Sequence, residues 1–230
     1  MSGTATTTTL EERLRSVPRP VPLLSRDGHA ALTSRQREIL DDLTDLIVDG
    51  FSHLTMADIA ARLGCSLRTL YGIASSRDQL VLLACDTALW RTGRGARSAA
   101  GEAGALDPLA TIRSYLRAAT RAVSATTPAF MADLAGVPGG AELGSAHSRY
   151  LVDITKELLD AAVDAGQIAD VDTLVVAHAI AGISNVFTRP DVIDTLPGTP
   201  KEASDHIAAL ILRGLTTPPE KPPTAALESS

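Results

Sequence analysis

The stretch that most constrains this chain is residues 55–80, TMADIAARLGCSLRTLYGIASSRDQL. Thr55 and Ser66 each stand where a helix N-cap is expected, because their hydroxyls can accept hydrogen bonds from free backbone N–H groups. Gly64 lies between the two segments and tolerates the positive φ that a sharp turn requires. Ala60 is small enough to let a second helix cross the first at close range. This spacing predicts a helix-turn-helix whose second helix is free to read a DNA groove.

The outward side chains of the second helix carry the predicted chemistry. Arg68 occupies the reading position, and the hydroxyls of Ser66, Thr69 and Tyr71 are short donors suited to DNA phosphates. Arg77 falls in the first turn of the following helix, where it can reach a phosphate. The candidate DNA contacts are Thr55, Ser66, Leu67, Arg68, Thr69, Tyr71, Gly72 and Arg77. In the alternative interpretation the motif binds protein or is purely structural, with Tyr71 in the core.

Residues 33–85 resemble the DNA-binding domain of TetR-family transcriptional regulators. That family has a Gly-x-Ser-x-x-Thr-Leu-Tyr segment followed by aromatic or His positions, then Ser-Lys and a further helix. The matching residues here are Gly64, Ser66, Thr69, Leu70 and Tyr71, followed by Ser76, Arg77 in place of Lys, and Leu80. The sequence departs from the family at Gly72, Ile73 and Ala74, which replace the usual aromatic and His residues.

The resemblance implies a transcriptional regulator that binds a palindromic operator in double-stranded DNA as a homodimer. Most often in this family the protein is a repressor that a small-molecule inducer releases. Two other functions stay open at this point. The chain could be an all-α ligand-binding protein or enzyme with a structural helix-turn-helix, or a regulator controlled by a protein partner.

The fold class predicted from composition and pattern is all-α, with about nine helices. Aromatic residues make up only 3% of the chain and hydrophobic residues 45%, so the core must consist of Leu, Ile, Val and Ala, which favour helices. The predicted organisation is a flexible arm (1–32), a three-helix helix-turn-helix domain (33–78), a helical ligand-binding and dimerisation domain (79–215) and a disordered tail (216–230). Prolines at positions 18, 20 and 22 favour a mobile arm, and a basic arm that enters a minor groove is the alternative.

The regulatory region offers a dimer surface and a ligand site. The segment 172–187 is apolar nearly all round, and the amphipathic segment 200–214 follows it, so two copies of each could form a four-helix bundle. The alternative is that 172–187 is the core helix of a monomer. The ligand-site candidates, chosen from their positions on helices, are Trp90, Tyr115, Phe130, Met131, His147 and Tyr150. The Gly-rich segment 93–105 lacks helical periodicity and is predicted to be a linker.

Other chemistry is not indicated. The chain has no His-Glu-x-x-His, Cys-x-x-Cys or Gly-x-Ser-x-Gly motif, so we expect no catalytic residue, no metal site, no cofactor and no enzyme activity. Cys65 is interpreted as a packing residue, and a thiol sensor involving Cys65 or Cys85 is the alternative. No apolar run approaches the roughly 18 residues that span a bilayer, and no signal-peptide core is present, so a cytoplasmic protein is expected.

Overall fold

The computed structural model describes residues 9–102, 107–123, 127–187 and 189–216, and within these ranges the only regular secondary structure is helical, without a strand. The all-α prediction is therefore confirmed, with twelve helices in the described residues where about nine were expected. The helices are α1 (Leu10–Ser16), α2 (Arg26–Ala31), α3 (Ser34–Leu46), α4 (Met56–Arg62), α5 (Leu67–Tyr71), α6 (Arg77–Glu102), α7 (Pro108–Val123), α8 (Pro128–Ala135), α9 (Gly140–Asp164), α10 (Thr173–Val186), α11 (Pro190–Ile193) and α12 (Pro200–Thr216).

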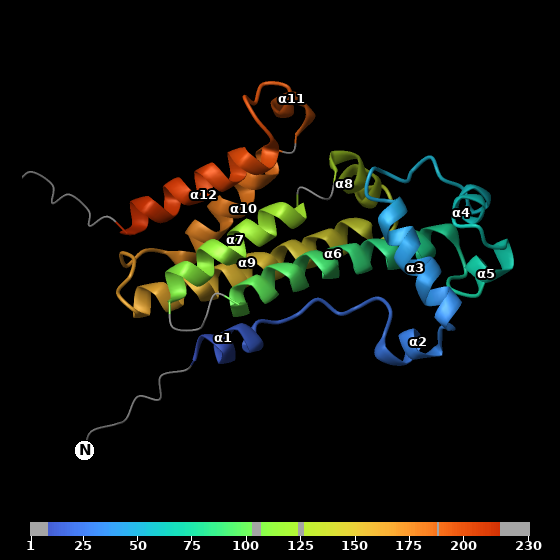
Figure 1. The fold of residues 1–230 in the computed structure, drawn as a ribbon, viewed down its shortest axis with the longest axis horizontal. Coiled ribbons are helices and arrows are strands. Elements are labelled where there is room, and N and C mark those ends of the chain that lie inside the picture. The colour runs from blue at the N-terminus through green and yellow to red at the C-terminus, as the bar shows by residue number, and fades with distance from the viewer. Residues whose placement is uncertain (1–8, 103–106, 124–126, 188, 217–230) are drawn as a thin grey trace, which may run out of the picture.

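The predicted helix-turn-helix is present as α4 and α5, with α3 packed against them (Figure 1). Thr55 caps α4 in a capping box with Asp58, and Ser66 caps α5 by accepting from the Thr69 backbone N–H. Gly64 adopts φ +58° in the turn between the two helices. A Cβ at Gly64 would meet nothing within 4 Å, so glycine is favoured there by the backbone conformation and not by crowding.

Helix α6 is longer than predicted. Residues 93–102, which were predicted to be part of a linker, are the C-terminal part of this helix, so the linker prediction is wrong for them. This segment continues the helix because α6 packs along α7 and α9, which compensates for the weak helix propensity of its glycines. Gly93 is buried, and a Cβ placed there would lie 3.6 Å from the Tyr150 ring. The last three residues of the predicted linker lie outside the described residues.

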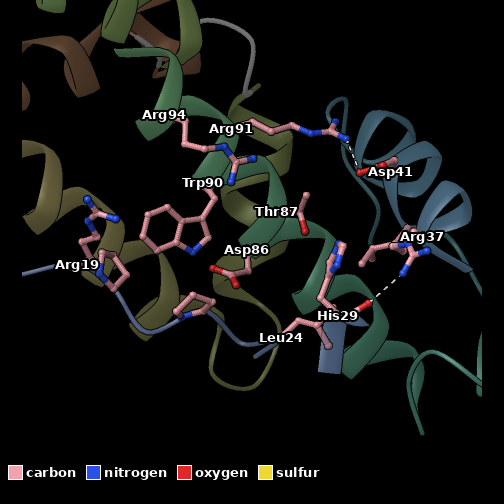
Figure 2. Close-up of a pocket in the computed structure, with 13 residues that line it drawn as sticks. Arg19, Leu24, His29, Arg37, Asp41, Asp86, Thr87, Trp90, Arg91 and Arg94 are labelled. Atoms are coloured by element: carbon pink, nitrogen blue, oxygen red, sulfur yellow. Dashed lines mark hydrogen bonds and ion pairs between the residues drawn. The ribbon is translucent and has the colours of Figure 1, made fainter. Parts of the chain in front are cut away.

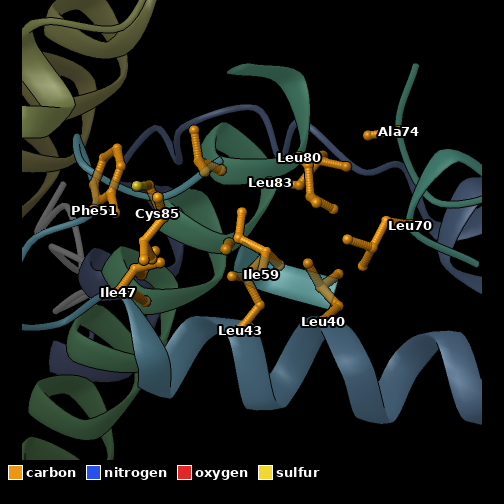
Figure 3. Close-up of a cluster of buried hydrophobic side chains, with 14 of the residues drawn as sticks. Leu40, Leu43, Ile47, Phe51, Ile59, Leu70, Ala74, Leu80, Leu83 and Cys85 are labelled. Atoms are coloured by element: carbon orange, nitrogen blue, oxygen red, sulfur yellow. The ribbon is translucent and has the colours of Figure 1, made fainter. Parts of the chain in front are cut away.

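Two hydrophobic clusters divide the molecule, and α6 contributes to both. The first unites α3, α4, α5 and the N-terminal half of α6, with Ile39, Leu43, Ile59 and Leu70 fully buried (Figure 3). The second unites α1, α7, α9, α10 and α12, and Trp90 of α6 packs against it. Residues of α8 and the start of α9 also belong to the first cluster, so the helix-turn-helix packs against helices that follow it in the chain.

The N-terminal region differs from the predicted flexible arm. Leu10, Leu14 and Val17 are buried in the second cluster, and Arg13 forms an ion pair with Asp164 of α9. Between α1 and α2 the chain crosses the body in an extended path over residues 18–25, here called the strap (Figure 1). The prolines do prevent a helix in the strap, but the apolar residues on either side hold the segment to the body. Residues 1–8 and the predicted tail from 217 lie outside the described residues.

Polar contacts fix the helix-turn-helix to the body at two places. Asp133 of α8 accepts hydrogen bonds from the backbone N–H groups of Phe51 and, at 2.7 Å, of Ser52. Arg91 of α6 binds Asp45 at 2.7 Å and Asp41 at 2.8 Å, both on α3. No helix among the described residues has the length and apolar character needed to cross a membrane.

We expect Leu14→Ala to lower the free energy of unfolding by about 2 kcal/mol, because it removes buried methyl groups from the second cluster. Val21→Ala is the matched control, since Val21 lies in the strap with 84% of its surface exposed and its truncation should cost less than about 0.5 kcal/mol. Urea unfolding of both variants measures the difference. Equal stability of the two variants would show that α1 is not packed on the body.

The contact at Asp133 predicts a pH dependence. Partial burial raises the pKa of Asp133, but the N–H groups of Ser52 and Phe51 lower it more, so the net pKa lies below its ordinary value. Because the pKa of this carboxyl is lower in the folded state, its ionised form stabilises the fold at pH values above the ordinary aspartate pKa of about 3.9. This stabilisation is lost as the pH falls through the folded-state pKa. Asp133→Asn should therefore reduce the loss of unfolding free energy that sets in as the pH falls below about 5, measured by urea unfolding. The control Asp42→Asn changes an exposed carboxylate and should leave the pH dependence of the unfolding free energy as in the unaltered protein. The same pH dependence in Asp133→Asn would contradict the prediction.

Candidate nucleic-acid interface

The exposed face of α5 lies at one end of the molecule (Figure 1). Leu70 points inward and is fully buried, whereas Leu67, Arg68 and Tyr71 are exposed, Tyr71 with 55% of its surface. Tyr71 is therefore not a core residue, which removes the main support for a purely structural motif. The face combines a cation, a phenol and an apolar side chain, the kinds of group that contact phosphates, base edges and thymine methyl groups.

The hydroxyls among the candidate contacts are already engaged in local hydrogen bonds. Thr55 Oγ1 donates to Asp58 Oδ2 at 2.6 Å, and Ser66 Oγ lies 2.8 Å from Thr69 Oγ1. These bonds stabilise the starts of α4 and α5. Among the described residues, neither the Arg68 guanidinium nor the Tyr71 hydroxyl has a protein partner, so both can bind a ligand without breaking an internal contact.

Gly72 explains the local departure from the family pattern. It is the C-cap of α5, and a Cβ there would lie 2.8 Å from Gln36 Nε2 on α3. Gln36 in turn accepts hydrogen bonds from the N–H and hydroxyl of Thr33 in the capping box of α3. An aromatic residue at position 72 would need Gln36 to leave this position, so the glycine suits the close approach of α5 to the start of α3.

The structure gives Arg77 an internal role. Its guanidinium donates to the carbonyl oxygens of Leu54 and Phe51, each at 2.6 Å, and of Ser52 at 3.2 Å. The side chain thus ties the start of α6 to the loop between α3 and α4. A contact between Arg77 and DNA stays a prediction, and it would compete with three carbonyl acceptors.

The six ligand-site candidates divide into separate places. Trp90, His147 and Tyr150 meet at the junction of α6 and α9, with the Trp90 ring 5.2 Å from the His147 ring and 6.0 Å from the Tyr150 ring. Tyr115 is buried nearby and its hydroxyl donates to the Leu151 carbonyl at 3.0 Å. Phe130 instead packs edge-on against Phe51 in the first cluster.

Met131, the last candidate, is an exposed residue of α8. A single site formed by all six candidates is therefore not supported, because Phe130 and Met131 lie with the helix-turn-helix.

The cysteines give no support to a thiol sensor. Burial raises the pKa of the Cys85 thiol to about 12, and burial also raises the pKa of Cys65. Both thiols are therefore poorly ionised near neutral pH, where a reactive cysteine needs its thiolate.

A cavity of about 500 Å³ opens where the strap and α2 cross α3 and α6 (Figure 2). Its size falls in the range of small-molecule sites. The cavity is lined by Arg19, Pro20, Pro22, Leu24, His29, Arg37, Leu40, Asp41, Asp86, Thr87, Trp90, Arg91 and Arg94. Only Trp90 was a ligand-site candidate from the sequence. The other residues were missed because the strap was predicted to be mobile and Arg94 was placed in the predicted linker. The spacing of Arg91 and Arg94 on one helix is the signal that could have found them.

Comparison with solved structures identifies the fold. The structure aligns with a TetR transcription regulator from Haloarcula marismortui at a TM-score of 0.66 and 19% identity, covering 80% of this chain and 100% of that one. A TetR-family regulator from Agrobacterium tumefaciens gives a TM-score of 0.63 at 18% identity, covering 80% and 98%. The TetR-family regulator PfmR from Thermus thermophilus aligns with a TM-score of 0.54 at 22% identity, and the alignment covers 78% of this chain and 99% of PfmR.

No family model and no curated protein matches the sequence. At these identities the alignments concern the fold, and they extend over nearly the whole length of each solved structure. They agree with the resemblance indicated by residues 33–85. The chain has the all-helical fold of TetR-family transcriptional regulators.

Proposed function

We propose that this protein is a DNA-binding transcriptional regulator that inserts α5 into the major groove of its operator. The observation that carries the proposal is the exposed face of α5, where Arg68, Leu67 and Tyr71 project from a helix-turn-helix. The fold likeness to transcription regulators supports it. In this proposal residues 33–78 form the reading domain and residues 79–215 the regulatory domain. Arg68 contacts a base edge and Tyr71 a phosphate, and the hydroxyls of Thr55, Ser66 and Thr69 contact phosphates by exchanging their local hydrogen bonds for bonds to DNA.

The proposed regulator acts as a homodimer through α10 and α12. Both helices are covered on one side by the body, while apolar residues remain exposed on the other side, including Leu174, Val175, Val186 and Leu210. A second copy would bury these residues in a four-helix bundle. The two-fold axis places two copies of α5 on a palindromic operator, with half-sites one or more turns of about 34–36 Å apart.

The regulation we propose is release of the operator by a small molecule, as expected of a repressor. A ligand bound between the reading domain and the regulatory domain would shift α6, because α6 packs in both hydrophobic clusters. The separation of the two reading heads would change with it. By linkage, operator DNA must weaken binding of this ligand by the same factor as the ligand weakens operator binding.

Arg68→Ala is expected to weaken binding to the specific operator by about 1–3 kcal/mol, with a smaller loss on random DNA, because a base contact is lost. The operator is first selected from a random duplex library with the unaltered protein, and affinities are then measured by fluorescence anisotropy at fixed salt. Tyr71→Phe should weaken binding to both DNAs by the same factor, since it removes a phosphate donor. Arg189→Ala, which changes an exposed residue at the start of α11, is the control. Equal losses of Arg68→Ala on both DNAs would make Arg68 a phosphate contact only.

Val175→Glu should convert the dimer into a monomer, because Val175 is 61% exposed on α10 and would lie in the dimer interface. Analytical ultracentrifugation should record half the mass of the unaltered protein. Val21→Glu is the matched control, because it places the same charge on an exposed valine of the strap. A dimer that survives Val175→Glu would move the interface away from α10.

A further inference from the structure

We propose that the cavity beneath the strap is a binding site for a small organic anion with an apolar body, such as a medium-chain carboxylate. The site has walls from four segments, the strap, α2, α3 and α6. Arg19 comes from the strap, Leu40 from α3, and Trp90 and Arg94 from α6 (Figure 2). It therefore lies at the junction of the reading domain and the regulatory domain.

The charge balance of the cavity favours an anion. Its two carboxylates are already engaged: Asp41 binds Arg91 at 2.8 Å, and Asp86 lies 2.9 Å from His147 Nε2. Asp86 also accepts from the Leu23 backbone N–H at 2.8 Å.

Two of the cavity's arginines have no polar partner in the described part of the chain. Arg91 pairs with Asp41 and Asp45, and Arg37 donates to the Leu32 carbonyl at 2.9 Å, whereas Arg19 and Arg94 make no hydrogen bond or ion pair with the described residues. A carboxylate bound at Arg19 or at Arg94 would gain charge-assisted hydrogen bonds without displacing an existing ion pair.

The remaining wall favours an apolar body next to the anionic group. Pro20, Pro22, Leu24 and Leu40 line the cavity together with the indole of Trp90, which the close-up places between Arg19 and Arg94 (Figure 2). Trp90 Nε1 is buried and has no hydrogen-bond partner in the described part of the chain. A buried donor without an acceptor is costly, so Trp90 Nε1 is a polar group in the cavity wall that the protein itself does not satisfy.

The position of the cavity links the proposed site to the proposed function. An occupant would touch the strap, α3 and α6 at once, next to the ion pairs that Arg91 makes with α3. Binding that moves α3 relative to α6 would change how the reading head is held. This coupling rests on the proposed function, whereas occupancy of the site can be measured without DNA.

The first experiment titrates the full-length protein with sodium octanoate and follows the fluorescence of Trp90, which is the only tryptophan in the chain. We expect a saturable fluorescence change with octanoate. With 1-octanol, which has a similar apolar body without the charge, half of the change should require at least a tenfold higher concentration. The absence of a saturable change with octanoate would overturn the proposal. Equal affinity for octanoate and octanol would overturn the assignment of an anion site.

The second experiment repeats the titration with Arg19→Ala combined with Arg94→Ala. Loss of the two cations should weaken octanoate binding by roughly tenfold or more, in line with the contribution of charge-assisted hydrogen bonds. The double variant removes no hydrogen bond or ion pair within the described residues, and both side chains are exposed, so its thermal unfolding should be close to that of the unaltered chain. Arg189→Ala is the control and should bind octanoate normally. Unchanged affinity in the double variant would place the octanoate elsewhere.

The third experiment separates this site from the proposed function. Octanoate should change the affinity for the selected operator in the unaltered protein, and the double variant should lose that response while it still binds DNA. Octanoate binding with no operator binding would overturn the proposed function and leave the anion site standing. Operator binding that octanoate alters equally in the unaltered protein and the double variant would overturn the coupling through this cavity.

Discussion

The fold depends on one continuous helix that belongs to both hydrophobic clusters. The N-terminal half of α6 buries Leu80, Ala84 and Cys85 in the cluster of the helix-turn-helix, and Trp90 packs against the cluster of the regulatory region. With 26 residues, α6 is about 39 Å long at 1.5 Å per residue. Because the helix is hydrogen-bonded along this length, a displacement at Trp90 is carried toward the start of α6. The glycines in its C-terminal part are tolerated because α7 and α9 support it.

Apolar burial holds the helix-turn-helix to α6, and a few polar contacts set its orientation. Arg77 donates to carbonyls of the loop after α3, Asp133 accepts from the same loop, and Arg91 binds two carboxylates of α3. The contacts of Asp133 and Arg91 join α8 and α6 to α3 and the loop that follows it, whereas the contacts of Arg77 lie within residues 33–78. The exposed ion pairs of Arg91 contribute little to stability, since such pairs are worth about 0–1 kcal/mol. Their main effect is on geometry, because they hold α3 and α6 in one relative position beside the cavity.

Local signals in the sequence predicted the helix-turn-helix, whereas tertiary contacts decided the parts that were missed. The side chains of Thr55 and Ser66 cap helices by accepting from backbone N–H groups three residues later, and Gly64 makes the turn through its positive φ. These roles depend only on neighbouring residues, so they could be predicted without the fold. The continuation of α6 beyond Gly93 depends on α7 and α9, which no local propensity reveals. Arg77 was predicted to contact phosphate because its three carbonyl acceptors lie more than 20 residues earlier in the chain. The pocket was missed for the same reason, since the strap, α3 and α6 meet only in the folded chain.

The arrangement leaves room for both proposed interfaces. The strap lies on one side of α6 and α9, and α10 and α12 lie on the other (Figure 1). A dimer formed through α10 and α12 would therefore leave the cavity accessible in each protomer. Each cavity would then contact its own reading head through α3, without a contribution from the partner. Ligand binding at one site could influence the other only through the relative position of the two heads on DNA, so any cooperativity in ligand binding should appear with operator present and vanish without it.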